Sequence, residues 1–276
     1  MPKFLLILID GCRPDALHEA RTPNIESLWK SGAYTWTAQT VMPSVTLPAH
    51  TSMFRSVSPH RHTIEADNIY KPAAAQFPSF VDVARCHRLH TAMFYTWEEL
   101  RDLSAPGSLN ASYYRFHRDG ENTCQVVAAA AAQYLVAEQP DLCILYMDDT
   151  DLRGHESGWM SRPYLDAVER SDQNVGIVLE ALDRANLREQ YTILVQSDHG
   201  GHEYNHGTEL PEDMNIPWIL NGPGVKQGYA IQTPVSIRDT AATITHALGL
   251  PRPEVWEGQP VYDALLQASA AAGQGA

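Results

Sequence analysis

The chain has 276 residues, of which 44% are hydrophobic, and it carries a formal net charge of −13. It is long enough to bury the core of one large domain, and no run approaches the roughly 18 apolar residues that a membrane span needs. An acidic surface does not attract nucleic-acid phosphates or anionic membranes, which excludes both as main partners. A small phosphorylated substrate stays compatible, because carboxylates can hold cations that make a site locally positive.

The first predicted element is a buried strand at residues 4–9, which ends at Asp10 and Gly11. The apolar run is too short for a signal peptide and lacks a small-residue cleavage site, so we expect a soluble, cytoplasmic protein. None of the four cysteines stands in a C-x-x-C pair, which favours reduced thiols. Asp10 follows its strand at the end where ligands bind in open α/β sheets, although a lone Asp there is also typical of a helix cap.

A helix over residues 23–31 with Thr22 as N-cap and a strand over 34–38 are predicted next. They are followed by the segment T-L-P-A-H, which begins at Thr46. Its proline predicts the first turn of a helix, so the Thr46 hydroxyl should lie at a helix N-terminus, where the macrodipole favours negative charge and helps a hydroxyl to ionise. A role for Thr46 as a plain helix cap is the alternative.

The middle of the chain contains further candidate site residues, among predicted helices and strands that alternate. His60 and His62 lie in a polar turn and are predicted to be surface residues, and the loop 65–68 could reach the same site as Thr46. Residues 97–120 are predicted to be irregular and are interpreted as an insertion or a segment that covers substrate. The regular elements predicted here are a helix at 79–87, a strand at 90–95, a helix at 124–137 and a strand at 142–147.

The last of these strands runs into an acidic turn that contains Asp151-x-x-Gly-His155. The spacing places a carboxylate and an imidazole one turn apart, so that they could bind one ion from two sides, with Gly154 allowing a bend between them. A dense acidic cluster is costly unless cations neutralise it. A solvated acidic loop without a metal is the alternative.

The remaining third of the chain contains another strand that ends at ligand-type side chains. The strand at 191–195 ends in Asp198 and His199, followed by a glycine-rich loop with His202 and His206. An Asp-His pair beside glycines is often only a capped loop, but here it follows a strand. The other elements predicted in this part are the longest helix at 164–185, a strand at 216–220, a helix from 237 to about 249 and a disordered tail at 267–276.

Strands and helices alternate along the whole chain, which predicts an α/β fold with a mostly parallel central sheet and helices on both faces. In such a sheet the carboxyl ends of parallel strands share one edge. Four predicted strand ends therefore bring ligand-type side chains to that edge, and this joint placement favours a metal site over four unrelated caps. The side chains are Asp10, Thr46, Asp151 with His155, and Asp198 with His199.

In this order the motifs resemble the alkaline phosphatase superfamily, nearest to its nucleotide pyrophosphatase/phosphodiesterase branch, over about residues 4–250. The resemblance implies one domain over residues 1–266 and two zinc ions. One ion would be held by Asp10, Thr46, Asp198 and His199, and the other by Asp151, His155 and a later histidine. We choose His206 over His202 for that last position because it lies a few residues before Asn215-Ile-Pro, as a comparable histidine does in related metalloenzymes.

The resemblance also implies a mechanism. Thr46, ionised with the help of zinc, would attack phosphorus to give a phosphothreonine intermediate, which water then hydrolyses. Asn68 matches an asparagine that holds a non-bridging phosphate oxygen in this branch, and an ordinary turn residue is the alternative. Because T-L-P-A-H replaces the branch's T-F-P-N-H, the substrate stays open among phosphodiesters, pyrophosphates, phosphomonoesters and phosphonates.

Other classes of function fit the sequence less well. A sulfatase needs Cys or Ser followed by x-Pro-x-Arg, whereas Thr46 precedes Leu-Pro-Ala-His. A non-catalytic binding protein would be expected to lack one of the ligands, and a metal-dependent mutase needs a large cap that this chain lacks. The expected activity is therefore a two-zinc phosphoester hydrolase, most simply a phosphodiesterase or nucleotide pyrophosphatase. The sequence leaves the oligomeric state open.

Overall fold

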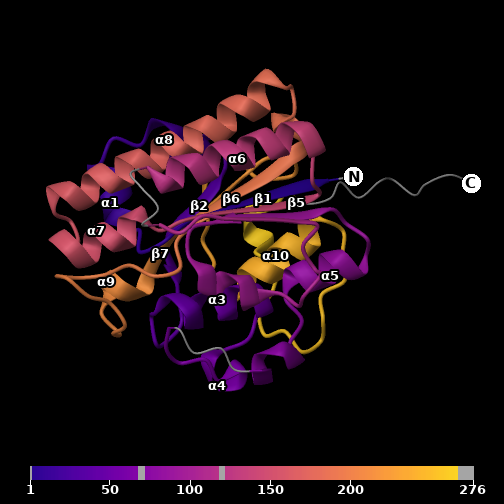
Figure 1. The fold of residues 1–276 in the computed structure, drawn as a ribbon, viewed down its shortest axis with the longest axis horizontal. Helices are drawn as coiled ribbons and strands as arrows, with labels where there is room; N and C mark the ends of the chain where they lie inside the picture. Colours follow the sequence, from indigo (N-terminus) through magenta and orange to yellow (C-terminus); the bar gives the residue numbers. More distant parts are fainter. Residues whose placement is uncertain (1, 68–71, 118–121, 267–276) are drawn as a thin grey trace, which may run out of the picture.

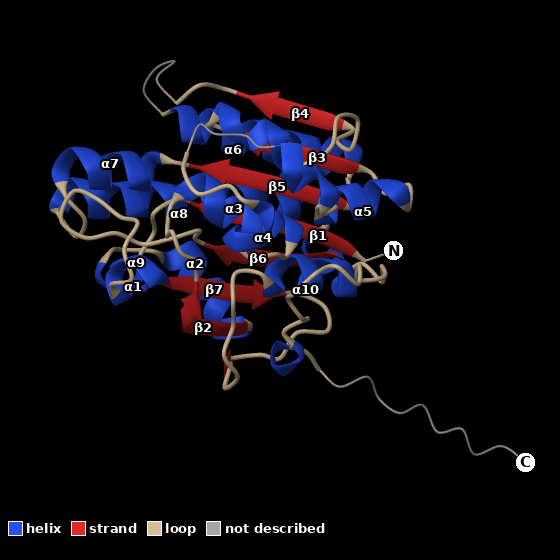
Figure 2. Cartoon of the chain, turned by 90° about the horizontal axis from the view of Figure 1, so that it is seen from below, coloured by secondary structure: helices blue, strands red, loops and turns tan. Residues whose placement is uncertain are grey.

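An eight-stranded sheet crosses the middle of the computed structural model, which describes residues 2–67, 72–117 and 122–266 (Figure 1). The strand order is β4-β3-β5-β1-β6-β7-β2-β8. Only β7 is antiparallel to its neighbours among the described strands, and Figure 2 shows it running against β5 and β4. The strands are β1 (Lys3–Ile9), β2 (Ala33–Gln39), β3 (Thr91–Tyr95), β4 (Ala111–Tyr114), β5 (Leu142–Met147), β6 (Tyr191–Gln196), β7 (Asn215–Asn221) and β8 (Tyr229–Ala230).

Helices cover both faces of this sheet, which confirms the predicted α/β architecture. In Figure 1, α1, α6, α7 and α8 lie on one side of the sheet and α3, α4, α5 and α10 on the other. The α-helices are α1 (Pro14–Glu19), α2 (Pro23–Ser31), α3 (Thr46–Arg55), α4 (Pro59–His62), α5 (Phe80–Cys86), α6 (Thr123–Glu138), α7 (Asp149–Ser157), α8 (Arg162–Arg184), α9 (Pro211–Met214) and α10 (Asp239–Ala247). Short 3-10 helices span Pro72–Gln76, Glu98–Leu103, Arg188–Gln190 and Tyr262–Ala264.

The central strand β1 is apolar from Phe4 to Ile9 because both of its faces are covered. Its alternate residues enter two cores, one on each face of the sheet. Its register fixes the functional edge, because Ile9 pairs with Met147 on β5 and Leu8 pairs with Gln196 on β6. The residues that follow these three strands therefore emerge side by side.

Two local predictions were wrong. The segment 97–120 is not irregular throughout its described part, because Ala111–Tyr114 forms the edge strand β4 and pairs in parallel with β3. Its interpretation as an insertion stays a prediction. His62 is not a surface residue: it is fully buried, its Nε2 lies 2.9 Å from the Ser52 hydroxyl, and its Nδ1 accepts from the Ile64 amide. The predicted disordered tail at 267–276 lies outside the described residues.

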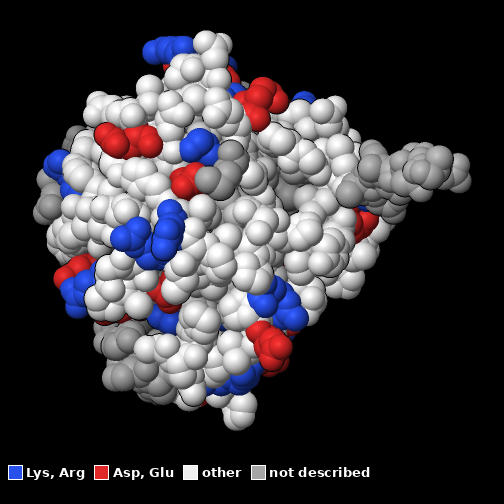
Figure 3. Space-filling model, turned by 90° about the vertical axis from the view of Figure 1, so that its right-hand side faces the viewer, with Lys and Arg blue, Asp and Glu red and all other residues white. Residues whose placement is uncertain are grey.

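The face in Figure 3 carries charges of both signs, and the cysteines form no disulfides. No helix within the described ranges is both long and apolar enough to span a membrane. Basic and acidic side chains are interspersed on the face that Figure 3 shows, so this face is not uniformly acidic. All four cysteines are free, and Cys86 alone is exposed among them. The cytoplasmic location stays a prediction.

The N-terminus of α2 is capped by a side chain from another helix. Thr22 occupies the N-cap position, as predicted, but its hydroxyl donates to the Leu17 carbonyl and caps nothing. Asp172 of α8 instead accepts from the Ile25 amide at 2.8 Å and from the Asn24 side-chain amide at 2.8 Å. This buried carboxylate satisfies the free N–H groups of α2 and ties the helix to α8.

Replacing Asp172 should therefore cost more stability than removing the Thr22 hydroxyl. Asp172→Ala leaves buried amide donors without an acceptor and should lower the free energy of unfolding by about 2–3 kcal/mol, whereas Thr22→Val should cost about 1 kcal/mol or less. Urea unfolding of the two variants measures both changes. The opposite ranking would mean that Thr22 is the true cap.

Candidate metal centre

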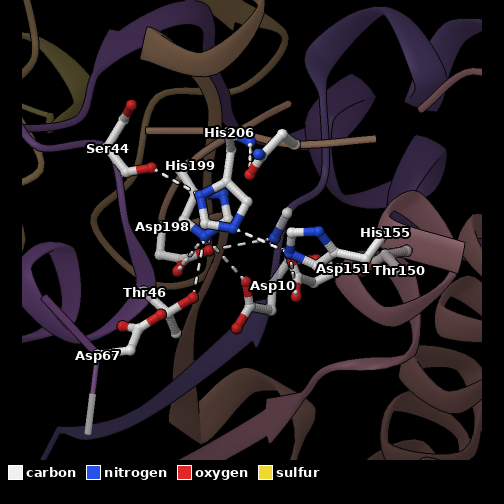
Figure 4. Close-up of polar contacts among 12 residues, drawn as sticks. Asp10, Ser44, Thr46, Asp67, Thr150, Asp151, His155, Asp198, His199 and His206 are labelled. Atoms are coloured by element: carbon white, nitrogen blue, oxygen red, sulfur yellow. Dashed lines mark hydrogen bonds and ion pairs between the residues drawn. The ribbon is translucent and has the colours of Figure 1, made fainter. Parts of the chain in front are cut away.

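The candidate site lies at the carboxyl edge of the sheet, beside α7. Figure 4 shows the side chains predicted for the metal site converging there from separate elements. Asp10 follows β1, Asp151 and His155 lie on α7, and Thr46 begins α3. The converging residues are Asp10, Thr46, Asp151, His155, Asp198, His199 and His206. Asn68 lies outside the described residues.

A first group of three ligand-type residues, Asp151, His155 and His206, could hold one ion. Their nearest ligand atoms all lie within 4.8 Å of one another. Asp151 and His155 project from one face of α7, because residues four apart on a helix are neighbours. The predicted bend at Gly154 was wrong: this glycine is inside the helix, and a Cβ there would lie 2.5 Å from the Trp159 ring.

The tips of the two imidazoles in this group face each other. The Nδ1 of His155 lies 3.0 Å from the Tyr204 carbonyl, and the Nδ1 of His206 lies 2.9 Å from the Ser44 carbonyl. A carbonyl oxygen only accepts, so each Nδ1 carries the proton and each Nε2 has a bare lone pair in the neutral ring. The two Nε2 atoms are 3.1 Å apart. Such lone pairs repel each other unless a cation or a proton lies between them, and backbone-fixed imidazoles of this kind are typical of metal ligands.

A second group surrounds the Nε2 of His199. This atom lies 3.4 Å from Asp10 Oδ1, 3.3 Å from Asp198 Oδ2 and 3.0 Å from the Thr46 hydroxyl oxygen. Its Nδ1 is fixed by the Gly200 carbonyl at 2.8 Å. The two carboxylate oxygens are buried and have no hydrogen-bond partner in the described structure. Buried carboxylate oxygens without a donor fit a cation.

Asp151 connects the two groups. Its carboxylate, Asp10 and His199 also offer ligand atoms within 4.8 Å of one another, and its Oδ1 is buried without a hydrogen-bond partner. The rings of His199 and His206 stack with their centroids 3.8 Å apart. The two groups are therefore contiguous, and two cations could lie side by side there.

The electrostatics of the site favour a positive charge beside its carboxylates. Burial, and then the charges of Asp198 and Asp151, raise the pKa of Asp10 well above its usual range, and burial raises the pKa of Asp151 to about 6. Burial lowers the pKa of His199, but the charges of Asp198 and Asp151 outweigh it and the net pKa is raised. Burial and the charge of His199 lower the pKa of His206 to about 3, so this ring is neutral, as a metal ligand must be.

His202, the alternative to His206 in the sequence, lies outside both groups. Its Nδ1 is 2.8 Å from Oδ1 of the fully buried Asp213. The other Asp213 oxygen accepts from the amide and the hydroxyl of Thr208. His202 thus belongs to a hydrogen-bond network that shapes the loop carrying His206.

Three residues around the site were given no individual role from the sequence, although Asp67 belongs to the loop 65–68 that was predicted to reach the site. The Tyr146 hydroxyl donates to Asp10 Oδ2. The Nδ1 of the buried His50 lies 2.8 Å from the Thr46 carbonyl and 3.3 Å from Asp198 Oδ2. Asp67 accepts from the Leu47 amide. His50 stood in the quoted T-L-P-A-H segment and could have been found there, whereas Tyr146 reads as an ordinary buried strand residue.

Solved structures define the class of fold. An inactive threonine-to-alanine variant of murine ectonucleotide pyrophosphatase/phosphodiesterase 5, in complex with AMP, matches with a TM-score of 0.82 and 16% identity, covering 96% of this chain and 100% of that chain. A 2-O GAG sulfatase matches with a TM-score of 0.76 and 14% identity, covering 94% of this chain and 73% of that chain. The chain thus has the alkaline phosphatase-like fold.

Sequence comparison gives the family. The model of the type I phosphodiesterase/nucleotide pyrophosphatase family matches residues 4–85 and 87–220, so the chain belongs to this family, as its motifs predicted. It is 27% identical over 224 residues to rat ectonucleotide pyrophosphatase/phosphodiesterase family member 3, and 28% identical over 221 residues to human family member 1. These alignments cover 72% of this chain but 25% and 23% of the relatives, so the chain spans about a quarter of their length.

The two histidine assignments can be separated by metal titration. His206→Ala should weaken zinc binding by about a hundredfold or more at one site, because loss of even an outer-shell partner costs roughly 10- to 100-fold. His202→Ala should leave a much smaller effect, since its side chain bonds to Asp213. Calorimetric titration of zinc into chelator-treated proteins measures both affinities. Loss of a site in His202→Ala, with none in His206→Ala, would contradict the assignment.

Proposed function

We propose that this protein is a two-zinc phosphoester hydrolase of the phosphodiesterase/nucleotide pyrophosphatase type, with Thr46 as its nucleophile. The observation that carries the proposal is the position of the Thr46 hydroxyl, 3.0 Å from His199 Nε2 and at the first residue of α3, beside two contiguous ligand groups. Family membership supports hydrolysis of a phosphoester bond. The murine neighbour's complex with AMP supports a small phosphorylated substrate.

The donor atoms favour zinc over magnesium or calcium. Both groups mix imidazole nitrogen with carboxylate oxygen, whereas Mg²⁺ and Ca²⁺ prefer oxygen alone. One ion would be held by Asp151, His155 and His206. The other would be held by the residues around His199, namely Asp10, Thr46, Asp198 and His199. When bound, zinc lowers the pKa of a coordinated hydroxyl and offsets negative charge on phosphoryl oxygens.

The chain's own residues position the reaction. The Thr46 oxygen attacks phosphorus, and the bond from phosphorus to the leaving-group oxygen breaks as the Thr46 Oγ–P bond forms. The leaving group takes a proton from solvent. Water then attacks phosphorus and gives up its protons to the Thr46 oxygen and to solvent, and the Oγ–P bond breaks. The product leaves, a phosphomonoester when the substrate is a diester, and Thr46 is restored. The N-terminus of α3 favours the negative charge that the Thr46 oxygen carries before attack.

The substrate class is the open part of this proposal. Phosphomonoesters and phosphonate esters could react at the same site, because both present a phosphorus atom to Thr46. The structural likeness to a sulfatase concerns the fold alone. Thr46 followed by Leu47 and Pro48 does not fit the sulfatase motif noted above.

Replacing the nucleophile should abolish turnover without emptying the metal site. Thr46→Ala should lower kcat by at least about a thousandfold, because the covalent step is lost, while Thr46→Ser should keep measurable activity. Hydrolysis of bis-p-nitrophenyl phosphate, p-nitrophenyl phosphate and a phosphonate ester measures this loss.

Metal analysis of the same proteins supplies the control. Wild type and Thr46→Ala should each contain about two zinc ions per chain, since six other side chains stay in place. Full activity in Thr46→Ala, or wild type without bound zinc after zinc loading, would refute the mechanism. A monoester rate above the diester rate would reject only the substrate class.

A further inference from the structure

A carboxylate lies at the N-terminus of α3, directly beside the proposed nucleophile. The Asp67 Oδ1 atom accepts from the backbone amide of Leu47 at 2.8 Å. Figure 4 shows the Asp67 side chain next to Thr46, on the side away from His155. No residue of the α3 first turn is acidic and Val45 provides no side-chain cap, so Asp67 supplies the negative charge at this helix end.

Covalent geometry limits the distance between Asp67 and the reacting atom. The Leu47 nitrogen is bonded to the carbonyl carbon of Thr46, so the Asp67 carboxylate lies within roughly 7 Å of the Thr46 hydroxyl. Burial raises the pKa of the Asp67 carboxyl group above its usual value, and the Leu47 hydrogen bond and the charge of His199 oppose this shift. Asp67 therefore lies in the electrostatic field of the site without belonging to either ligand group.

This arrangement changes what the helix end can bind. Free amides at a helix N-terminus are ready donors to phosphate oxygens. Here the Leu47 amide donates to Asp67, so any substrate oxygen competes with this carboxylate for the amide. The fixed carboxylate also adds a negative charge where the phosphoryl group must approach.

We propose that Asp67 is a specificity-determining residue that selects phosphodiesters over phosphomonoesters, an inference that rests on the proposed function. A diester carries one negative charge on two non-bridging oxygens. A monoester dianion carries two charges on three such oxygens, so it meets greater repulsion from the Asp67 carboxylate. The carboxylate thus costs the dianion more than the monoanion.

Two substitutions of the same kind test this role. Asp67→Asn keeps an oxygen that can accept from Leu47 and removes the charge. Asp82→Asn is the matched control, because Asp82 also accepts at a helix N-terminus, from the Ser79 amide at 2.8 Å, and lies on α5 outside the site. Zinc content and melting temperature of each variant show whether the fold and the metal site persist.

The readout is a ratio of substrates rather than an absolute rate. At pH 8, Asp67→Asn should raise the ratio of kcat/KM for p-nitrophenyl phosphate over bis-p-nitrophenyl phosphate by about tenfold or more. Inorganic phosphate, titrated calorimetrically into the zinc-loaded proteins, should bind Asp67→Asn correspondingly more tightly. Asp82→Asn should leave the ratio and the phosphate affinity as in wild type.

Parallel loss of both activities in Asp67→Asn, or an unchanged ratio and phosphate affinity, would overturn the inference and leave Asp67 as a helix cap. If wild type hydrolyses neither ester, the proposed function fails. The phosphate titration still decides on Asp67 in that case, because tighter binding by Asp67→Asn supports the discrimination and equal binding rejects it.

Discussion

The structure depends on one electrostatic constraint, the gathering of two buried carboxylates, Asp10 and Asp198, and the partly buried Asp151 at a single edge of the sheet. Each has a buried oxygen without a hydrogen-bond partner in the described structure. Burying charge without compensation is costly, so such a cluster persists only where cations or protons neutralise it. The raised pKa values of Asp10 and Asp151 express this cost. A pair of divalent cations would remove it.

The surrounding fold fixes these groups before any ion arrives. The in-register pairing of β1 with β5 and β6 sets the carboxylates side by side, and backbone carbonyls hold the outer nitrogens of His155, His199 and His206. Residues positioned by strands and backbone lose little entropy on binding. Thr46 lies beside the same edge, at the start of α3, where the helix dipole favours negative charge on its hydroxyl oxygen. The proposed hydrolysis of a phosphoester follows from this combination of metal-ligand side chains and a threonine hydroxyl.

The sequence predicted the strands and the residues at their ends because both depend on local patterns. A run of buried apolar residues that ends shortly before Asp10 or Asp198 predicts both the strand and the site residues that follow it. Interactions between distant segments gave no such signal. Asp172 caps α2 from 147 positions away in the sequence from Ile25, and Gly154 within α7 leaves the space that the Trp159 ring occupies. His62 likewise looked like a surface residue because its buried environment comes from tertiary packing.

The central claim is that this edge binds two cations in contiguous sites. Anomalous X-ray scattering at the zinc absorption edge, on crystals of the zinc-loaded protein, tests it most directly. The account predicts two peaks roughly 4 Å apart, one beside His155 and His206 and the other beside Asp10 and His199. A single peak, or peaks away from these residues, would contradict it.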